Sequence, residues 1–491
     1  PRIKTNRERS IPHNLKWCED TGRISNFAKA AGLMEGKFEG IYFNDSDVYK
    51  VLEGVSYALA QQPDPVLEKE ADRIIGLIAA AQRPDGYLNT YYTLTGLDKR
   101  WTNLPVMHEL YCSGHLFEAA VAHHRATGKS NFLDVAVKLA NHIDSIFGPG
   151  KKYGVPGHEE IELALVKLFE VTGEKRYFEL AKFFIDERGN TTHRQSYGPY
   201  CQDHMPVRQQ SEIVGHAVRA MYLYSGVADV AAYTGDAELM TAMDRIWKDV
   251  TLRKMYITGG IGARHEGEAF GDAYELPNES AYCETCAAIG LVFWAYRLGL
   301  MLGDAQYADV LERTLYNGVL SGVAVDGEHF FYVNPLASGG NHHRQPFFGC
   351  ACCPTNVVRL IPSVPGYIYA VRPAEGERGA ELFVNLYVGS EAKIALEPDN
   401  MVAIGQETRY PWEGRIVLSV SPQVEKEWTL RLRIPAWCHD ASVSVNDGAP
   451  VQVDMSKLDR GYYLLRRTWK QGDRVILELA MPVERMEAHP K

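Results

Sequence analysis

Residues 157–173 read GHEEIELALVKLFEVTG and hold one amphipathic helix together with its start and stop signals. Apolar residues recur at three- and four-residue spacing from Ile161 to Val171, which is the period of an α-helix that buries one face. Gly173 follows the last turn, as glycine commonly does at a helix C-terminus. Because one amphipathic helix cannot bury its own apolar face, this stretch predicts a partner helix packed against it.

The same arrangement recurs along the chain. Further amphipathic segments cover residues 109–125, 216–233 and 287–302, and each is closely followed by a glycine. Another amphipathic run then begins within a few residues, which is typical of a helical hairpin. Hairpins that recur every ~45 to 70 residues pack side by side into an array or a closed toroid. We therefore expect a mainly α chain with an α/α barrel, and an irregular helical bundle is the alternative.

After about Tyr369 the pattern changes to short runs of alternating apolar and polar residues, separated by Pro, Gly and an Asn-Asp-Gly turn. Period-two alternation with close turn signals predicts an antiparallel β-sandwich. We place the helical domain at residues 1–370 and the sandwich, incomplete at its C-terminus, at residues 371–491. The expected strands are 382–388, 415–420, 429–434, 441–445 and 462–466.

Composition narrows the choice of partners. The 491 residues carry a formal net charge of −10, spread along the sequence without a basic stripe. Nucleic acid and anionic membranes are therefore poor candidates, and a small neutral or polar ligand fits better. No apolar run approaches the ~18 residues of a membrane helix, and no secretory leader is recognisable, so we expect a cytoplasmic protein.

Five of the nine cysteines fall in two tight clusters, Cys283-Glu284-Thr285-Cys286 and Cys350-Ala351-Cys352-Cys353. Such clustering indicates a metal centre or catalysis before disulfides. Together the clusters supply enough soft ligands for one tetrahedral zinc ion. Spacing alone does not choose the ligands, and a structural site could be formed by Cys283, Cys286, Cys350 and Cys353.

Carboxylates form a second group of candidates. A glycine-rich segment that starts near Thr258 and lies between two long helices carries Glu266, Glu268, Asp272 and Glu275. Long loops on a rigid scaffold often hold catalytic groups, although a single loop carboxylate is usually only a solvated charge.

Three histidines form a third group, because His108, His158 and His216 each stand at the start of a long helix. In a helical toroid the helix starts on one rim surround the mouth, so three imidazoles there could line one polar pocket. The alternative for each is a helix cap or a surface residue.

Residues 262–290 and 349–356 resemble the bacterial β-L-arabinofuranosidases of glycoside hydrolase family 127. Similar phrases occur at 43–50, 85–88, 108–111, 157–164, 215–219 and 332–334, so the resemblance covers nearly the whole chain. It implies an (α/α)6 barrel followed by β-sandwich domains, with zinc bound by Glu284, Cys286, Cys352 and Cys353. This set replaces the four-cysteine site, and Cys283 and Cys350 then become packing neighbours.

The resemblance also implies a retaining, exo-acting hydrolase that removes terminal β-L-arabinofuranosyl residues, with Cys352 as nucleophile and Glu268 as general acid/base. Metal coordination deprotonates a thiol and so yields a nucleophile without a separate base. Glu268 must act first as acid and then as base, so its pKa is expected near the working pH. The implied sugar contacts are His108, His158, His216 and Tyr332.

Three alternatives remain from the sequence. Relatives with the same zinc and cysteine act on other sugars, including branched acidic sugars of pectin, so the sugar could differ. The chain could be a non-catalytic carbohydrate-binding scaffold with structural zinc, or a polysaccharide lyase that uses Tyr and His. The expected partner is a small molecule or oligosaccharide containing L-arabinofuranose, and a homo-oligomer stays open.

Overall fold

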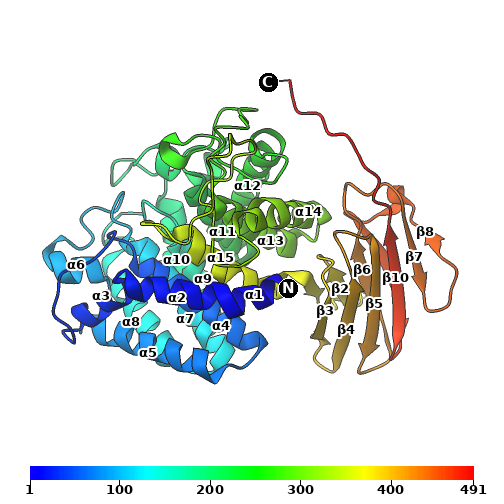
Figure 1. Cartoon of the computed structure of the whole chain (residues 1–491), viewed down its shortest axis with the longest axis horizontal. Coiled ribbons are helices and arrows are strands. Elements are labelled where there is room, and N and C mark those ends of the chain that lie inside the picture. Colours follow the sequence, from blue (N-terminus) through cyan, green and yellow to red (C-terminus); the bar gives the residue numbers. More distant parts are fainter. Residues whose placement is uncertain (377, 491) are drawn as a thin grey trace. The chain divides into compact units, whose positions relative to one another are not determined.

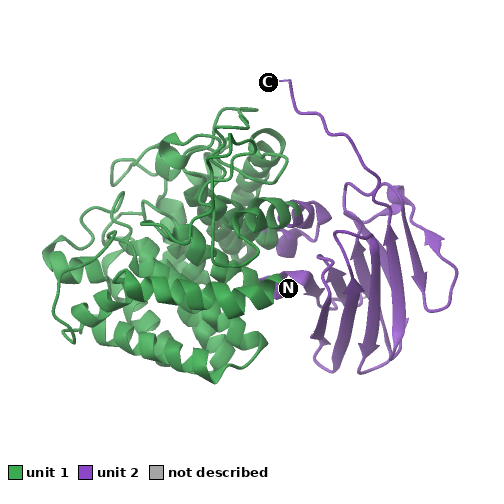
Figure 2. Ribbon diagram, viewed as in Figure 1, with its two compact units in different colours: residues 1–297, 313–363, 491 green, residues 298–312, 364–490 purple. Residues whose placement is uncertain are grey.

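The computed structural model describes residues 1–376 and 378–490 and divides into two compact units (Figure 2). The first unit comprises residues 1–297 and 313–363, and the second comprises 298–312 and 364–490. The domain boundary that was predicted between residues 370 and 371 falls inside strand β1 (Tyr369–Arg372).

The first unit is built of helices, with six inner helices surrounded by outer ones (Figure 1). The first four inner helices pack in chain order, and the sixth packs against the first. The fifth inner helix packs closely on the fourth at Gly290. A Cβ added to Gly290 would lie 2.7 Å from the Cβ of Met221 on the fourth helix, so only glycine fits there. The predicted (α/α)6 barrel is confirmed, and the irregular bundle is wrong. The inner helices are α4 (Asp45–Gln61), α7 (Glu109–Thr127), α9 (Ile161–Thr172), α11 (Ala217–Thr234), α13 (Thr285–Leu302) and α15 (Cys352–Ser363).

Inner and outer helices differ in how their sequences bury side chains. In α7 every residue from Glu109 to His123 is buried, as expected for a helix surrounded by protein. In the outer helix α8 (Asn131–Ile146) the buried residues recur at the spacing of one face, for example Phe132, Val135 and Leu139. The other helices around the inner six are α2 (Ile11–Asp20), α3 (Arg23–Ala30), α5 (Pro65–Ala81), α10 (Lys175–Glu187) and α12 (Ala237–Asp249), with shorter helices α1 (Arg2–Thr5) and α6 (Thr90–Thr95).

The glycines that end the inner helices adopt the left-handed conformation. Gly128, Gly173 and Gly235 have φ values of 72°, 73° and 65°, and each donates its N–H to a carbonyl of the last turn. A residue with a side chain is strained in this conformation, so glycine marks where each inner helix turns into its outer partner.

Helix α13 corrects one expectation from composition. Alone among the described helices, it is long and apolar enough to cross a membrane, although no such segment was expected. However, 61% of this helix is buried inside the protein, where Trp294 is fully covered. Its apolar character is therefore explained by its place in the barrel core.

The second unit contains two sheets, one of order β1-β2-β6-β9 and one of order β3-β4-β5-β10-β7-β8. All described strand pairs are antiparallel except β2 with β6, which is parallel. The predicted sandwich is therefore confirmed with one parallel pair. Beside β1 the strands are β2 (Glu381–Val384), β3 (Ser390–Glu397), β4 (Asn400–Thr408), β5 (Arg415–Pro422), β6 (Lys426–Arg433), β7 (Ala441–Val445), β8 (Val451–Gln452), β9 (Tyr462–Trp469) and β10 (Asp473–Leu479).

The same unit includes two helices, α14 (Ala305–Arg313), which lies in it up to Glu312, and α16 (Pro365–Ile368). Arg433 of β6 is fully buried and pairs with Asp309 and Glu312 of α14. Tyr410 donates a further hydrogen bond of 2.6 Å to Glu312. Buried, fully paired charges of this kind fix α14 to the sheet.

Candidate active site

One cavity of about 190 Å³ in the first unit gathers most of the residues singled out from the sequence. It is smaller than the ~300 Å³ typical of pockets for drug-sized ligands, so it suits a single sugar unit. A cleft of about 320 Å³ beside His265 and His342 contains none of these residues. The candidates that line the smaller cavity are His108, His158, His216, Glu268, Glu284, Cys286, Tyr332 and Cys352.

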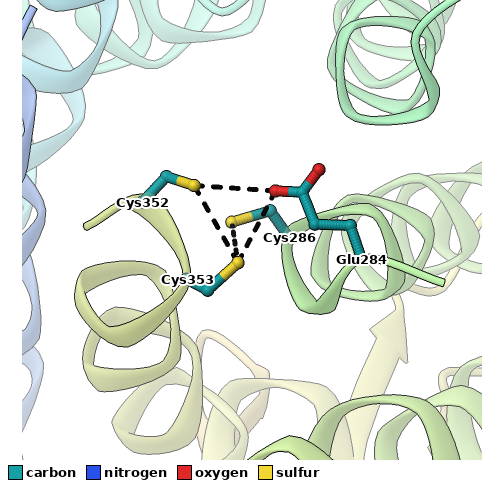
Figure 3. Close-up of side chains that lie close together, drawn as sticks. All are labelled: Glu284, Cys286, Cys352 and Cys353. Carbon is teal, nitrogen blue, oxygen red and sulfur yellow. Dashed lines mark hydrogen bonds between the residues drawn. The ribbon is translucent and has the colours of Figure 1, made fainter. Parts of the chain in front are cut away.

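Two helix starts bring four ligand atoms together at the base of this cavity. Glu284 and Cys286 flank the first residue of α13, and Cys352 and Cys353 open α15. One oxygen of Glu284 and the three sulfurs lie within 4.8 Å of one another and face a common point (Figure 3). Glu284, Cys286 and Cys353 are buried, and Cys352 is partly exposed to the cavity.

The spacing of these atoms fits a tetrahedral metal ion. Bonds of ~2.3 Å to sulfur and ~2.0 Å to oxygen place two ligand sulfurs ~3.8 Å apart and a sulfur ~3.5 Å from the oxygen. Here the Cys352 and Cys353 sulfurs are 3.9 Å apart, those of Cys286 and Cys353 are 3.3 Å apart, and Glu284 Oε1 lies 3.6 and 3.5 Å from the sulfurs of Cys352 and Cys353.

The charge state of the cluster also favours a cation. Burial raises the pKa of Glu284 well above its ordinary value, and the Cys352 sulfur adds to this effect. Burial likewise raises the pKa of Cys353. Glu284 Oε2 is buried and, among the described residues, has no hydrogen-bond partner. Burying several acidic groups without a cation costs free energy of folding, and a bound metal ion would remove this cost.

The four-cysteine site considered from spacing alone is wrong for this fold. Cys283 packs in a separate apolar cluster with Tyr256, Ala263 and Ala281. Cys350 lines the cavity but does not belong to the group of four converging ligand atoms.

Cys352 stands where a thiolate is stabilised. It is the first residue of α15, and a helix N-terminus favours negative charge. The Tyr332 hydroxyl lies 3.0 Å from its sulfur. Burial raises the pKa of Tyr332 well above its ordinary value, so this phenol stays protonated. Its O–H can then donate a hydrogen bond to Cys352 when that residue is a thiolate.

Glu268 pairs with His216 across the cavity. His216 Nδ1 accepts the N–H of Val218 at 3.2 Å, which leaves the ring proton on Nε2. Nε2 lies 2.8 Å from Glu268 Oε2 and therefore donates to this carboxylate. Burial opposes ionisation of Glu268, but the hydrogen bond and charge of His216, together with hydrogen bonds from Tyr282 and Glu284, outweigh it and lower the pKa of Glu268 to about 2. The expectation of a pKa near the working pH is therefore wrong for this arrangement, in which Glu268 is in its base form.

The three histidines form a row along the cavity. The ring centroids of His108 and His158 are 5.4 Å apart, and those of His158 and His216 are 5.6 Å apart. Burial lowers the pKa of His108 to about 3, that of His158 well below its ordinary value, and that of His216 in the same direction. All three are therefore neutral hydrogen-bonding groups, which suits an uncharged sugar.

Sequence reasoning missed part of the lining, namely Tyr42, Phe43, Tyr111, Tyr200 and Arg219. Phe43, Tyr111 and Arg219 lie inside family-like phrases, but nothing in their spacing marks them. The sequence also does not reveal that His108 and Glu268 have positive φ values of 54° and 50°. Such strained backbone in residues other than glycine is concentrated at functional sites.

Comparisons with known proteins agree with this site. The family description β-L-arabinofuranosidase, GH127 catalytic domain, matches residues 1–366, and the GH127 middle domain matches residues 381–481. A non-reducing end β-L-arabinofuranosidase from Bifidobacterium longum is 38% identical over 95% of this chain and 75% of its own length. The crystal structure of a GH127 β-L-arabinofuranosidase from Geobacillus stearothermophilus T6 has 46% identity and a TM-score of 0.93, covering 99% of this chain and 81% of that one.

Proposed function

The chain belongs to glycoside hydrolase family 127, the β-L-arabinofuranosidases, and from this premise we propose that it removes terminal β-L-arabinofuranosyl residues with retention of configuration. Cys352 is the nucleophile and Glu268 the acid/base in this proposal. Membership of a hydrolase family sets aside the polysaccharide lyase considered from the sequence.

The observation that carries the proposal is the placement of Cys352 and the Glu268–His216 pair around one small cavity. Retention needs attack on the anomeric carbon from one face and proton transfer at the leaving oxygen. The limited volume of about 190 Å³ supports action on one terminal unit. Neutral histidines and Tyr332 would hold its hydroxyl groups.

In the first step the Cys352 sulfur forms a bond to the anomeric carbon while the bond from that carbon to the leaving oxygen breaks. Glu268 takes up a proton from solvent as the sugar binds and gives this proton to the leaving oxygen. The Glu268 side chain is 33% exposed, so a bound sugar covers it and raises its pKa toward the protonated form. Tyr332 and the start of α15 stabilise the thiolate before attack.

In the second step Glu268, now a carboxylate, takes a proton from water. The water oxygen bonds to the anomeric carbon, the carbon–sulfur bond breaks and the Cys352 thiolate returns. His216 keeps Glu268 oriented in both steps through its Nε2–H. Two inversions at one carbon give net retention.

The metal in this proposal is zinc, because three thiolates with one carboxylate form the soft, tetrahedral set that zinc prefers. Glu284, Cys286, Cys352 and Cys353 would hold it. When bound, zinc keeps Cys352 deprotonated at neutral pH.

Mass spectrometry after incubation with a β-L-arabinofuranosyl cyclophellitol-type trap tests the proposal. We expect one pentose-sized adduct on the peptide that contains Cys352, and none in Cys352→Ser. Cys350→Ser is the matched control, because this neighbouring thiol lies in the same cavity but outside the ligand group, and it should keep the adduct. Sugar binding without an adduct in the zinc-loaded wild type would instead favour the non-catalytic scaffold.

A further inference from the structure

Arg219 of α11 is a buried cation without an anionic partner. It is 4% exposed and lines the cavity. Five other arginines are buried in the described residues, and each has a carboxylate within 4.0 Å: the pairs are Arg23–Asp47, Arg188–Glu159, Arg359–Glu53, Arg431–Glu381 and Arg433–Asp309. Arg219 forms no such pair among the described residues, although a buried charge normally requires one.

Only one side of the Arg219 guanidinium is used by the protein. Nη1 donates to the carbonyl of Gly157 at 2.6 Å and lies 3.2 Å from the sulfur of Cys201. Nε is buried without a partner in the described part of the chain, and no hydrogen bond is formed there by Nη2. Of these two nitrogens only Nη2 is left uncovered, so its N–H groups are available to an oxygen atom of a ligand in the cavity.

Tyr200 lies over this guanidinium and places it beside the acid/base. The guanidinium carbon is 4.3 Å from the centroid of the Tyr200 ring, and the ring is 5.6 Å from that of His216. A Cβ added to Gly267, the residue before Glu268, would lie 3.5 Å from the Tyr200 ring. Because Tyr200 is 42% exposed, it forms part of the mouth of the cavity on the Glu268 side.

The leaving group must lie on that side. Glu268 gives its proton to the leaving oxygen, whereas Cys352 attacks from the opposite face of the sugar. Resting on the proposed function, we propose that Arg219 and Tyr200 bind the unit beyond the scissile bond, and that this unit is a sugar. A hydroxyl group of this sugar accepts a hydrogen bond from Arg219 Nη2, and the Tyr200 ring covers an apolar face of the leaving sugar.

The test compares two substrates with the same β-L-arabinofuranosyl unit, a methyl glycoside and a disaccharide. Both have alcohol leaving groups that need the acid, but only the disaccharide can contact Arg219 and Tyr200. The measured quantity is the ratio of kcat/KM for the disaccharide to kcat/KM for the methyl glycoside. Arg219→Gln should lower this ratio about 10-fold or more, as expected for a lost hydrogen bond to a charged group.

Arg245→Gln is the matched control, because Arg245 also donates to backbone carbonyls, of Arg208 and Gln210, but does not line the cavity. Its ratio should equal that of the wild type. Tyr200→Ala should lower the ratio, and Tyr200→Phe, which keeps the ring, should preserve it.

An unchanged ratio in both Arg219→Gln and Tyr200→Ala overturns the inference, even if both rates fall, because that pattern indicates a structural role. Failure of the proposed function looks different: the wild type would then hydrolyse neither substrate.

Discussion

Two buried clusters in the barrel meet the same geometric condition for a metal site and differ in charge. Glu284, Cys286, Cys352 and Cys353 form one, and His115, Glu118 and Glu160 form the other, each with its ligand atoms within 4.8 Å of one another. In the second cluster Arg359 pairs with Glu118 at 2.5 Å and lies 3.7 Å from Glu160. The first has no Lys or Arg pairing with Glu284 among the described residues.

This difference shows that closely spaced ligand atoms do not by themselves identify a metal centre. Arg359 of α15 also pairs with Glu53 of α4 at 2.9 Å and donates to the Tyr222 hydroxyl of α11 at 3.0 Å. One guanidinium therefore joins several inner helices, and Lys167 adds a second positive charge at Glu118. We call this group the Arg359 network. Its donors are neutralised by the protein itself, whereas the thiol cluster leaves its charge for a ligand.

The largest expected effect concerns the thiol cluster. Cys352→Ala should lower kcat/KM for a β-L-arabinofuranoside about 10⁴-fold or more, because the covalent route is lost. Steady-state kinetics measure this effect, and elemental analysis of the same sample separates loss of the nucleophile from loss of the metal. A variant that retained substantial activity would show that Cys352 is only a ligand.

Loss of the Arg359 network should lower the stability of the fold. Arg359→Leu leaves Glu53 buried without its cation and leaves Glu118 paired with Lys167 alone, so we expect the free energy of unfolding to fall by about 3–5 kcal/mol. Chemical denaturation measures the change.

The matched control is Arg125→Leu, which breaks a pair with Glu170 whose side chains are 54% and 37% exposed. This change should cost less than about 1 kcal/mol. Equal costs for both variants would contradict the distinction between the clusters.

Removal of the metal should affect the thiol cluster but not the Arg359 network. Chelation should lower the free energy of unfolding by about 3–4 kcal/mol, as for a ligand that binds only the folded state well above its dissociation constant. Helical circular dichroism should persist, because the Arg359 network needs no metal. Cys352 should at the same time become more reactive toward an alkylating reagent, which peptide mass spectrometry locates. Unchanged stability together with no bound metal in the purified protein would refute the metal centre.

The sequence predicted the fold where periodicity is strong. The segments 109–125, 159–171, 216–233 and 287–302 correspond to α7, α9, α11 and α13, and five predicted strands correspond to β2, β5, β6, β7 and β9. Strands β1, β3, β4, β8 and β10 were not predicted. In β3 and β4 burial alternates, but charged and small residues dilute the pattern in 390–408.

The site was predictable only through its unusual residues. The family-like phrases pointed to Glu284, Cys286, Cys352 and Cys353, whereas cysteine spacing alone left a four-cysteine site with Cys283 and Cys350 open. The choice depends on the turn before α13, where Cys283 has a φ of 41° and points into its own apolar cluster. The low pKa of Glu268 was equally hidden, because it depends on the distance to His216, 52 residues away in sequence. Tyr200 and Arg219 carry no pattern at all and emerge only from the folded cavity.

The smallest expected effect concerns Asp203, which fixes the segment that carries Tyr200. Its fully buried carboxylate accepts hydrogen bonds of 2.6 Å from Arg194 and from the backbone of Gly189 and Tyr197. Burial opposes ionisation, but these donors outweigh it and lower the pKa of Asp203. Asp203→Asn should therefore cost about 1–3 kcal/mol at pH 7.

The pH dependence of this cost follows from the direction of the shift. Because the folded-state pKa lies below the unfolded value of ~3.9, the stabilisation is present above that pH and is lost as pH falls through the folded-state pKa. The difference in unfolding free energy between wild type and Asp203→Asn should therefore shrink below about pH 4. A gap that stayed constant from pH 7 to pH 3 would mean that Asp203 stabilises this segment through its shape and not through its charge.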